Sequence, residues 1–397
     1  MIPLLAWAFY DFANTIFSAI VLTAYFPLYL KDLAGANWIL GAATTGSMIL
    51  AGIFTPAMGA LSDRTGKTRH YLIVTTLISI AFLYYLSVFK TVPFLIGAFV
   101  LSCFFYHAAL VFYNSLLVVA ADPEKQGFAS GLGTGLGYLG VVFALPAAHW
   151  VDSRFGRPQV FIAAAVLFLL FSLPAFFLVP ERKVQNPVSP GWDLWRKEWA
   201  GIFAILKKLP GNPALLLFLG GNFFVVDALN AAIFWLMVYT REVFHPGQGI
   251  LIGFLTALNA SAFLMGILSG ILTDRWGAAR TLTLSGAVLA GTLAILALTK
   301  SFPVFLAANL TGGAFAIAGI WTAGRKRLIE LAPREELGGY FGLYGLVTKI
   351  SVAGSLLFSI AADIAGFRPA LWILVFAAGI GTLFLAASKA APAPSSP

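Results

Sequence analysis

The sequence predicts an all-α membrane protein of about twelve transmembrane helices, arranged as two related six-helix bundles. Apolar residues make up 60% of the 397 residues and charged residues 10%, against about 45–50% and about 25% in soluble proteins. The apolar residues gather in long runs, and about 20 such residues cross a bilayer as one helix. A short loop pattern recurs in the second half of the chain. Together these observations indicate duplicated helical bundles in lipid.

The first apolar run is too long for a cleaved signal peptide and is interpreted as the first span. The runs do not show the turn-separated alternation of membrane strands, which favours helices. We expect helices near residues 4–30, 38–61, 71–89, 93–118, 128–150, 158–179, 213–240, 249–272, 281–299, 303–324, 338–362 and 367–388.

The longest polar gap, residues 181–212, divides the spans into an N-terminal bundle (1–180) and a C-terminal bundle (213–388). We interpret the gap as a cytoplasmic linker. Its charged, tryptophan-containing stretch, 192–208, is either a short amphipathic helix on the inner membrane surface or plain linker. Residues 389–397 are rich in Pro, Ala and Ser and are expected to form a disordered tail.

The distribution of Lys and Arg predicts the orientation. With both termini in the cytoplasm, the cytoplasmic segments hold 17 of the 25 Lys and Arg and the outer segments hold 7. Positive residues favour cytoplasmic loops, so we expect an integral multi-pass protein of the plasma (inner) membrane with both termini inside. The net charge of +9 is therefore interpreted as membrane orientation rather than nucleic-acid binding.

An internal repeat supports the two bundles. Residues 59–66 recur as residues 270–277, an offset of 211, with five of eight positions identical. The loop at residues 121–127 matches residues 332–338 at the same offset. Two loops that share one offset indicate a duplicated six-helix unit. Secondary transporters are often built from such repeats, with the substrate bound near the midplane where the repeats meet.

The repeated pattern is Gly-x-Leu-x-Asp-Arg-x-Gly. Its glycines permit close helix approach and a tight turn, and its Asp suits the positive N-terminal end of a neighbouring helix. Contacts of this kind can form in one conformation and break in another, so we expect a conformational latch; the alternative is a loop that only fixes topology. The predicted latch residues are Gly59, Asp63, Arg64, Gly66, Asp274 and Arg275.

This pattern resembles the loop signature of the major facilitator superfamily. The resemblance implies a twelve-helix transporter in which the Asp and Arg of both copies stabilise the outward-facing state. The first copy continues through Lys67 and Arg69 as in the family, whereas the second keeps only Arg280 on its basic end.

A narrower resemblance extends over nearly the whole chain. Residues 7–14 (WAFYDFAN), 112–117 (FYNSLL), 325–333 and 341–349 resemble the "unknown major facilitator" family. Fungal members of that family export amino acids from the vacuole, so the resemblance implies an amino acid as the substrate.

Ionisable residues deep within spans are costly, at about 2.5–3.5 kcal/mol each on insertion scales, unless they are paired or hydrated. Asp227 and Lys349 fall near the midplane, where they form a structural ion pair or bind a substrate charge when that pair opens. Asp11 is either a capping or hydrogen-bonding group or a proton carrier. His107 is either a core histidine or a proton carrier.

In the superfamily, spans 1, 4, 7 and 10 line the cavity, and here each carries polar side chains. Ordinary hydrogen bonding between helices is the alternative role for such groups. The candidate residues for substrate binding or coupling are Asp11, Asn14, His107, Tyr113, Asn114, Asp227, Asn230 and Lys349.

Several function classes have no signature in the sequence. No Gly-Lys-Ser/Thr phosphate loop is present, which argues against ATP hydrolysis. Cys103 is the single cysteine, and the four histidines are scattered without metal-ligand spacing. We expect no enzyme activity, cofactor, metal or nucleic-acid partner.

The favoured function is secondary active transport of a small polar solute, such as an amino acid, by alternating access with proton coupling. The expected partners are this solute, H⁺ and the lipid bilayer, and the expected state is a monomer. The alternatives are a membrane receptor or scaffold that binds without transporting, and a lipid transporter with a lateral opening.

Overall fold

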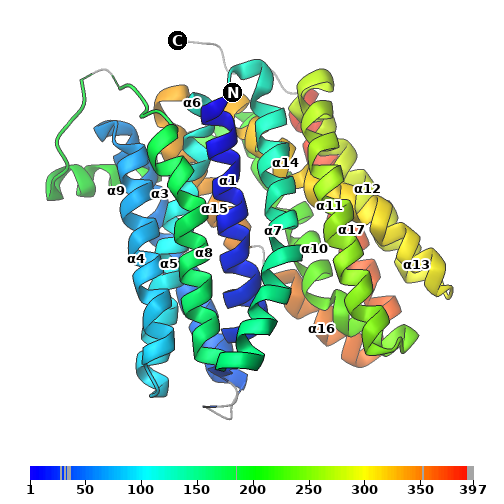
Figure 1. Ribbon diagram of the computed structural model, residues 1–397. Coiled ribbons are helices and arrows are strands. Elements are labelled where there is room, and N and C mark those ends of the chain that lie inside the picture. Colours follow the sequence, from blue (N-terminus) through cyan, green and yellow to red (C-terminus); the bar gives the residue numbers. More distant parts are fainter. Residues whose placement is uncertain (27–28, 31–32, 34–36, 185, 351–352, 391–397) are drawn as a thin grey trace. The chain divides into compact units, whose positions relative to one another are not determined.

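The computed structural model describes residues 1–26, 29–30, 33, 37–184, 186–350 and 353–390, and every regular element in these ranges is a helix (Figure 1). Among these residues, ten helices are long and apolar enough to cross a membrane. The predicted all-α class is therefore confirmed. The predicted tail, 389–397, begins inside a helix that continues to Ala390, and its remainder lies outside the described residues.

Two compact units divide the chain. Unit 1 comprises Met1–Pro123, Leu136–Ile202 and Pro333–Leu346, and unit 2 comprises Glu124–Gly135, Phe203–Ala332 and the chain from Val347 onward. Two short segments are thus grouped away from their sequence neighbours: 124–135 belongs to unit 2 and 333–346 belongs to unit 1. Each of these segments contains the start of a helix.

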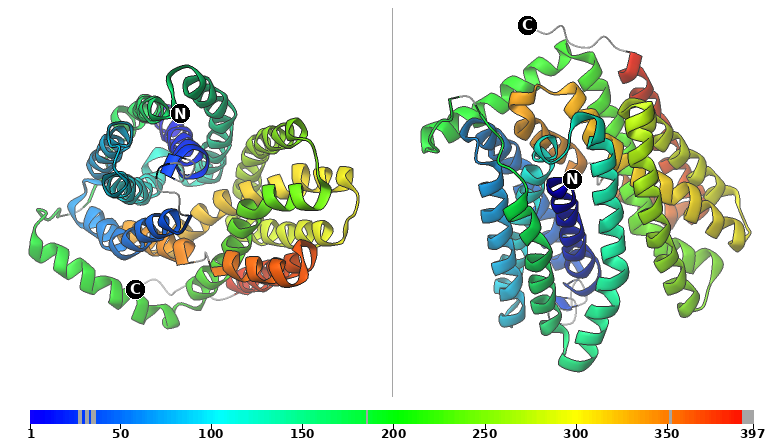
Figure 2. Two further views of the ribbon diagram at one scale, coloured as in Figure 1. Left: turned by 90° about the horizontal axis from the view of Figure 1, so that it is seen from below. Right: turned by 45° about the horizontal axis from the view of Figure 1, so that its top comes forward.

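In unit 1, α1, α4, α5 and α8 are long helices that run side by side, and the left panel of Figure 2 views them end-on. Aromatic side chains fill the space around α1: the Trp7 ring stacks on Tyr113 at 4.3 Å between centroids, and Tyr10 stacks on the same ring at 5.0 Å. The helices that lie wholly or mainly in unit 1 are α1 (Ile2–Phe17), α3 (Asn37–Thr65), α4 (Thr68–Val88), α5 (Val92–Ser115), α6 (Leu117–Ala120), α7 (Gln126–Phe155), α8 (Arg157–Leu178), α9 (Trp192–Lys208) and α15 (Leu337–Ile350).

In unit 2, α17 packs along α10 and α12, and α11 packs along α14. The helices of unit 2 are α10 (Pro213–Phe244), α11 (Gln248–Trp276), α12 (Ala278–Leu298), α13 (Phe302–Ala308), α14 (Ala314–Leu331), α16 (Ala353–Ala365) and α17 (Phe367–Ala390). Residues 351–352, between α15 and α16, fall within the predicted eleventh span and lie outside the described residues.

Several helices, including α3, α7, α11 and α14, extend past the predicted spans because polar residues at their ends continue the backbone hydrogen bonding. Asp63 and Asp274, expected in loops after the spans, lie in the last turns of α3 and α11. Two segments have wide π-helical turns that the sequence did not predict: η1 (Ser18–Tyr25), which continues α1, and η4 (Asn309–Gly313), which joins α13 to α14. Such turns are frequent at functional sites.

The charged stretch of the linker forms helix α9, which runs across the direction of α3 and α4 (Figures 1 and 2). Within unit 1, Trp195 and Trp199 of α9 contact the ring of Phe54 on α3, with centroids 6.4 and 6.2 Å apart. Arg196 and Lys197 are exposed. The stretch is therefore an amphipathic helix, which was one of the two interpretations of this part of the linker.

Glycine permits close helix crossings at equivalent positions of the repeat. Gly59 of α3 lies against Gly338 of α15, and in unit 2 Gly270 of α11 lies against Gly127 of α7. A Cβ atom at Gly59, Gly270 or Gly338 would meet backbone atoms of the facing helix, and one at Gly127 would meet the side chains of Thr273 and Asp274. Gly66 and Gly277, which follow α3 and α11, have φ of 65° and 90°, a region that favours glycine. The repeated glycines thus serve the close approach and the tight turn that the pattern predicted.

We predict that Gly131→Val destabilises the protein, because a Cβ there would collide with the carbonyl of Gly266 and lie 2.7 Å from the Cα of Gly270. Overpacking of this kind costs about 1–3 kcal/mol. Thermal unfolding of the purified protein measures it, with Gly291→Val as the control, since a Cβ at Gly291 has no neighbour within 4 Å. Equal melting temperatures for the two variants would contradict the proposed crossing.

Candidate functional site

The carboxylate of Asp63 caps the first turn of α15 within unit 1. Its Oδ1 accepts a hydrogen bond from the backbone N–H of Gly338, and its Oδ2 accepts one from Gly339, each at 3.0 Å. Only 5% of Asp63 is exposed. A helix N-terminus presents unpaired N–H groups and a partial positive charge, so it favours the ionised carboxylate. This is the environment that the sequence pattern predicted for Asp63.

Unit 2 contains the same arrangement at the equivalent positions. Asp274 Oδ1 accepts from the N–H of Gly127 at 2.9 Å, and Oδ2 accepts from the N–H of Phe128 at 2.7 Å. These two residues lie in the first turn of α7, as Gly338 and Gly339 lie in the first turn of α15. The duplicated sequence has therefore produced a duplicated cap.

Each capping carboxylate forms an ion pair with a basic side chain, and the repeat does not relate the positions of the two basic residues. Arg182, which follows α8, approaches Asp63 Oδ1 to 2.5 Å and also donates to the carbonyl oxygen of Arg334. Lys326, on α14, approaches Asp274 Oδ1 to 2.5 Å. The repeat offset places Ser115, not a cation, opposite Lys326. The side chains of Arg64 and Arg275, the predicted latch cations, are exposed.

A third carboxylate, that of Glu181, connects the linker to the start of α4, which follows the first copy of the repeated pattern. Glu181 Oε1 accepts from the backbone N–H of Arg69 in the first turn of α4 at 2.8 Å, and Oε2 lies 2.8 Å from Nδ1 of His70. The N–H of Val188 donates to the carbonyl of Arg64 at 3.1 Å. The segment after α8 is therefore fastened to both ends of the turn between α3 and α4.

A buried polar cluster lies between α1 and α5 in unit 1, and we call it the α1–α5 cluster. Asp11, Asn14 and Ser18 recur at helical spacing on one face of α1 and η1. The Tyr106 hydroxyl on α5 lies within hydrogen-bonding reach of the Asn14 and Ser18 side chains, and Asp11 is near enough to act on it electrostatically. Asp11 is 4% exposed and Asn14 is 7% exposed, and Asn14 Oδ1 has no hydrogen-bond partner among the described residues. An acid, an amide and two hydroxyls thus share one buried region.

The sequence identified Asp11 and Asn14 but not Ser18 and Tyr106. Ser18 could have been found from its place seven residues after Asp11, on the same helical face. His107, the first of the three site residues predicted on α5, is 9% exposed, and its ring centroid lies 5.0 Å from that of Tyr106. His107 therefore borders the α1–α5 cluster.

Tyr113 has the contacts of a core residue. Its ring is fully buried between Trp7 and Tyr10, and its carbonyl accepts from Trp7 Nε1 at 2.8 Å. The neighbouring Asn114 is half-buried, and its Oδ1 has no hydrogen-bond partner in the described part of the chain.

The C-terminal candidates lie on α10 and α15. Asp227 is buried at 7% exposure, whereas Asn230 on α10 and Lys349 at the end of α15 are half-buried. Asn222, one turn before Asp227, is fully buried, and neither of its side-chain polar atoms has a partner among the described residues. A buried amide without partners is costly in a bundle core, so Asn222, a polar residue of the seventh predicted span, is a further candidate. Groups of metal-ligating residues do not occur in the described parts of either unit.

The sequence profile of the Major Facilitator Superfamily matches residues 5–298 and 248–397. The chain belongs to the Major Facilitator Superfamily. This match confirms the superfamily-level resemblance and the predicted all-helical fold of the superfamily. Superfamily members are integral multi-pass membrane proteins. They are transporters of solutes and not enzymes.

Bacterial relatives in the superfamily cover most of the chain. An "Uncharacterized protein" of Aquifex aeolicus is 26% identical over 87% of this chain and 85% of its own length. The "Uncharacterized MFS-type transporter YxiO" of Bacillus subtilis is 25% identical over 96% of this chain and 93% of its own length. The "Multidrug resistance protein MdtG" of Salmonella choleraesuis is 27% identical over 64% of this chain and 62% of its own length.

Solved structures of the superfamily share the fold. The transporter FucP in its outward conformation has a TM-score of 0.75 at 14% identity, covering 98% of this chain and 99% of its own. The human organic anion transporter MFSD10 has a TM-score of 0.73 at 14% identity, covering 97% and 98%.

We predict that Arg182→Gln lowers the melting temperature, because it leaves the buried Asp63 carboxylate without its cation. Removing one partner of a buried ion pair costs about 3–5 kcal/mol. Thermal unfolding measures the loss, and the adjacent, exposed Lys183→Gln is the matched control.

The double variant Asp63→Asn with Arg182→Gln is expected to recover part of the loss, since neither charge is then left alone. If Arg182→Gln unfolds at the same temperature as Lys183→Gln, Arg182 does not stabilise the cap.

Proposed function

We propose that this superfamily member is a secondary active transporter of a small polar solute, with an amino acid as the first candidate. It works by alternating access in the plasma membrane, with both termini in the cytoplasm, and a proton moves with the solute. The α1–α5 cluster carries this proposal, because it places a carboxyl group beside an amide and two hydroxyls in a buried region of unit 1.

The composition of the cluster supports a polar solute. Asp11 can bind an ammonium group or a proton, and the Asn14 amide both donates and accepts hydrogen bonds. An ionisable side chain within a membrane span is by default a functional candidate because its burial is costly. The amino-acid assignment is supported by the resemblance to the "unknown major facilitator" family, and Asp227 and Lys349 are the proposed charges on the C-terminal side.

The capped helices support alternating access. Four backbone hydrogen bonds to the carboxylates of Asp63 and Asp274 hold α15 on α3 and α7 on α11. Hydrogen bonds to charged groups contribute about 1.5–3 kcal/mol each. Contacts of this size can be made and broken during a transport cycle, so we assign both caps, with Gly59, Gly66, Arg64 and Arg275, to the proposed latch.

Transport by proteoliposomes tests the proposal. The purified protein takes up a panel of labelled amino acids with and without a pH gradient, and counterflow is measured for each solute that is accumulated. We predict that Asp11→Asn reduces gradient-driven accumulation about tenfold or more, the effect of losing one charge-assisted hydrogen bond. The exposed Asp193→Asn on α9 is the control.

The counterflow result separates the two roles of Asp11. A proton carrier is dispensable for exchange, so counterflow persists in Asp11→Asn, whereas a substrate-binding carboxylate is needed for both modes. Unchanged uptake and unchanged pH dependence in Asp11→Asn would show that the proposed site is wrong.

Export of apolar compounds is a second candidate, favoured by the relatives named as multidrug resistance proteins. The same vesicles distinguish it when lipophilic cations are added to the panel. Movement of these cations without movement of any amino acid would favour this function over the first.

A further inference from the structure

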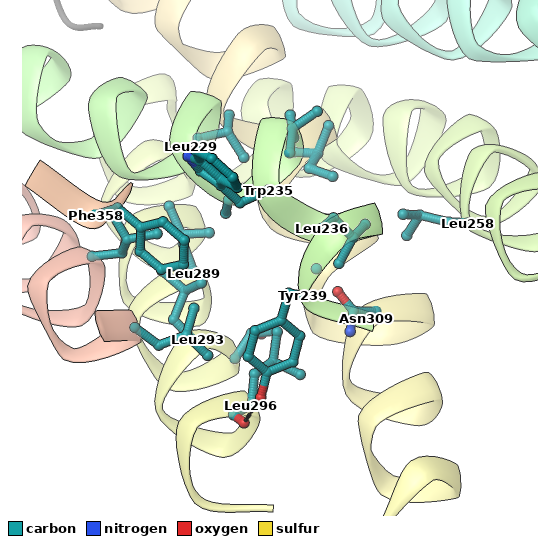
Figure 3. A pocket seen from close by; sticks show the side chains of 17 residues that line it. Leu229, Trp235, Leu236, Tyr239, Leu258, Leu289, Leu293, Leu296, Asn309 and Phe358 are labelled. Carbon is teal, nitrogen blue, oxygen red and sulfur yellow. Dashed lines mark hydrogen bonds between the residues drawn. The ribbon is translucent and has the colours of Figure 1, made fainter. Parts of the chain in front are cut away.

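A cavity lies inside unit 2, between α10, α12, α14 and α17 (Figure 3). Its empty space is about 570 Å³, which counts the gaps between side chains and an opening to the surroundings. The lining is almost wholly apolar and includes Leu229, Leu236, Leu289, Leu293, Leu296 and Phe358. Ile233 at its edge is 44% exposed, so an apolar molecule can enter there.

Polar atoms face this apolar space. Asn309 is 6% exposed, and its amide nitrogen donates to the carbonyl of Phe305 at 2.9 Å. The amide oxygen is turned toward the cavity between Leu236 and Tyr239 (Figure 3), and no described residue donates a hydrogen bond to it. The indole Nε1 of Trp235 is also buried without an acceptor in the described part of unit 2.

The local backbone keeps the Asn309 oxygen accessible. Asn309 opens the π-helical turn η4, and Gly313 closes it. A Cβ at Gly313 would lie 3.5 Å from the Asn309 oxygen, so the absence of a side chain there leaves the acceptor uncovered. The Tyr239 hydroxyl, in contrast, is occupied, because it donates to the carbonyl of Leu296 at 2.8 Å.

We propose that this cavity is a binding site for a small, mostly apolar molecule that carries one hydroxyl group, such as a phenol or a short alcohol. The hydroxyl donates to the Asn309 oxygen, and the apolar body lies against the leucines and the Trp235 ring. Apolar cavities in proteins bind small aromatic molecules, and an acceptor to which no described residue donates gains a hydrogen bond from the hydroxyl of the bound molecule.

The site differs from the proposed transport site in place and chemistry. The α1–α5 cluster belongs to unit 1 and is polar and acidic. This cavity is built from unit 2 alone, and among the described residues that line it the only ionisable side chain is that of Tyr239, which is engaged. Binding here does not require transport, so its test does not depend on the proposed function.

Fluorescence quenching by 4-bromophenol tests the site, because a bromine atom in contact with an indole quenches its emission. The protein has ten tryptophans, so single variants assign the signal. We expect a saturable component of quenching in the wild type, on top of a linear background from probe dissolved in detergent. Trp235→Phe abolishes the saturable component, and the exposed Trp276→Phe retains it.

A second comparison tests the hydroxyl. Asn309→Leu is expected to weaken 4-bromophenol binding about tenfold, the loss of one hydrogen bond of about 1.4 kcal/mol, and to leave bromobenzene binding unchanged. Leu293→Phe, which fills the cavity, removes the binding of both probes. Linear quenching in every protein overturns the site, and equal losses for both probes in Asn309→Leu overturn the role of its oxygen.

Discussion

A carboxylate that caps the start of a helix from another part of the chain is the interaction on which the described structure depends. Asp63 holds α15, and Asp274 holds α7, each through two backbone N–H groups. The geometry requires glycine at the crossing, because a Cβ at Gly59 or Gly338 would collide with the facing backbone. The glycines and the acids of the repeated pattern therefore form one device: glycine brings the helices together, and the carboxylate satisfies donors that the approach would otherwise bury unpaired.

Sequence reasoning predicted that the acid of the repeated pattern meets the N-terminal end of a neighbouring helix, but it did not predict which helix. The acid, the glycines and the loop that begins the capped helix all recur at one offset, and the physical need of a helix N-terminus for a negative charge supplied the rest. It did not predict Arg182 and Lys326 as the cations, because they come from the linker and from α14 and have no equivalents in the other copy. Tertiary packing alone brings them to the carboxylates.

The buried residues likewise include some that the sequence predicted and others that only tertiary packing brings together. Composition and run length were enough for the helices, and the spacing of Asp11 and Asn14 placed them on one face of α1. Tyr106 joins them from α5, more than 80 residues away in the chain, and only the packing of α5 on α1 reveals it. The cavity at Asn309 depends likewise on how several helices of unit 2 fit together, and on a π turn that hydrophobic periodicity does not register. The polar residues on one face of a helix can be predicted from the sequence, whereas the shape of a cavity between helices cannot.

Hydrogen exchange at the capped amides tests the central claim most directly. If the carboxylates hold these helices, exchange at Gly338 and Gly339 is slow in the wild type, and Asp63→Ala accelerates it without changing exchange at Gly127 and Phe128. Asp274→Ala should produce the reverse pattern. Exchange at all four amides that is the same in the wild type and both variants would show that the two caps do not hold the helix starts.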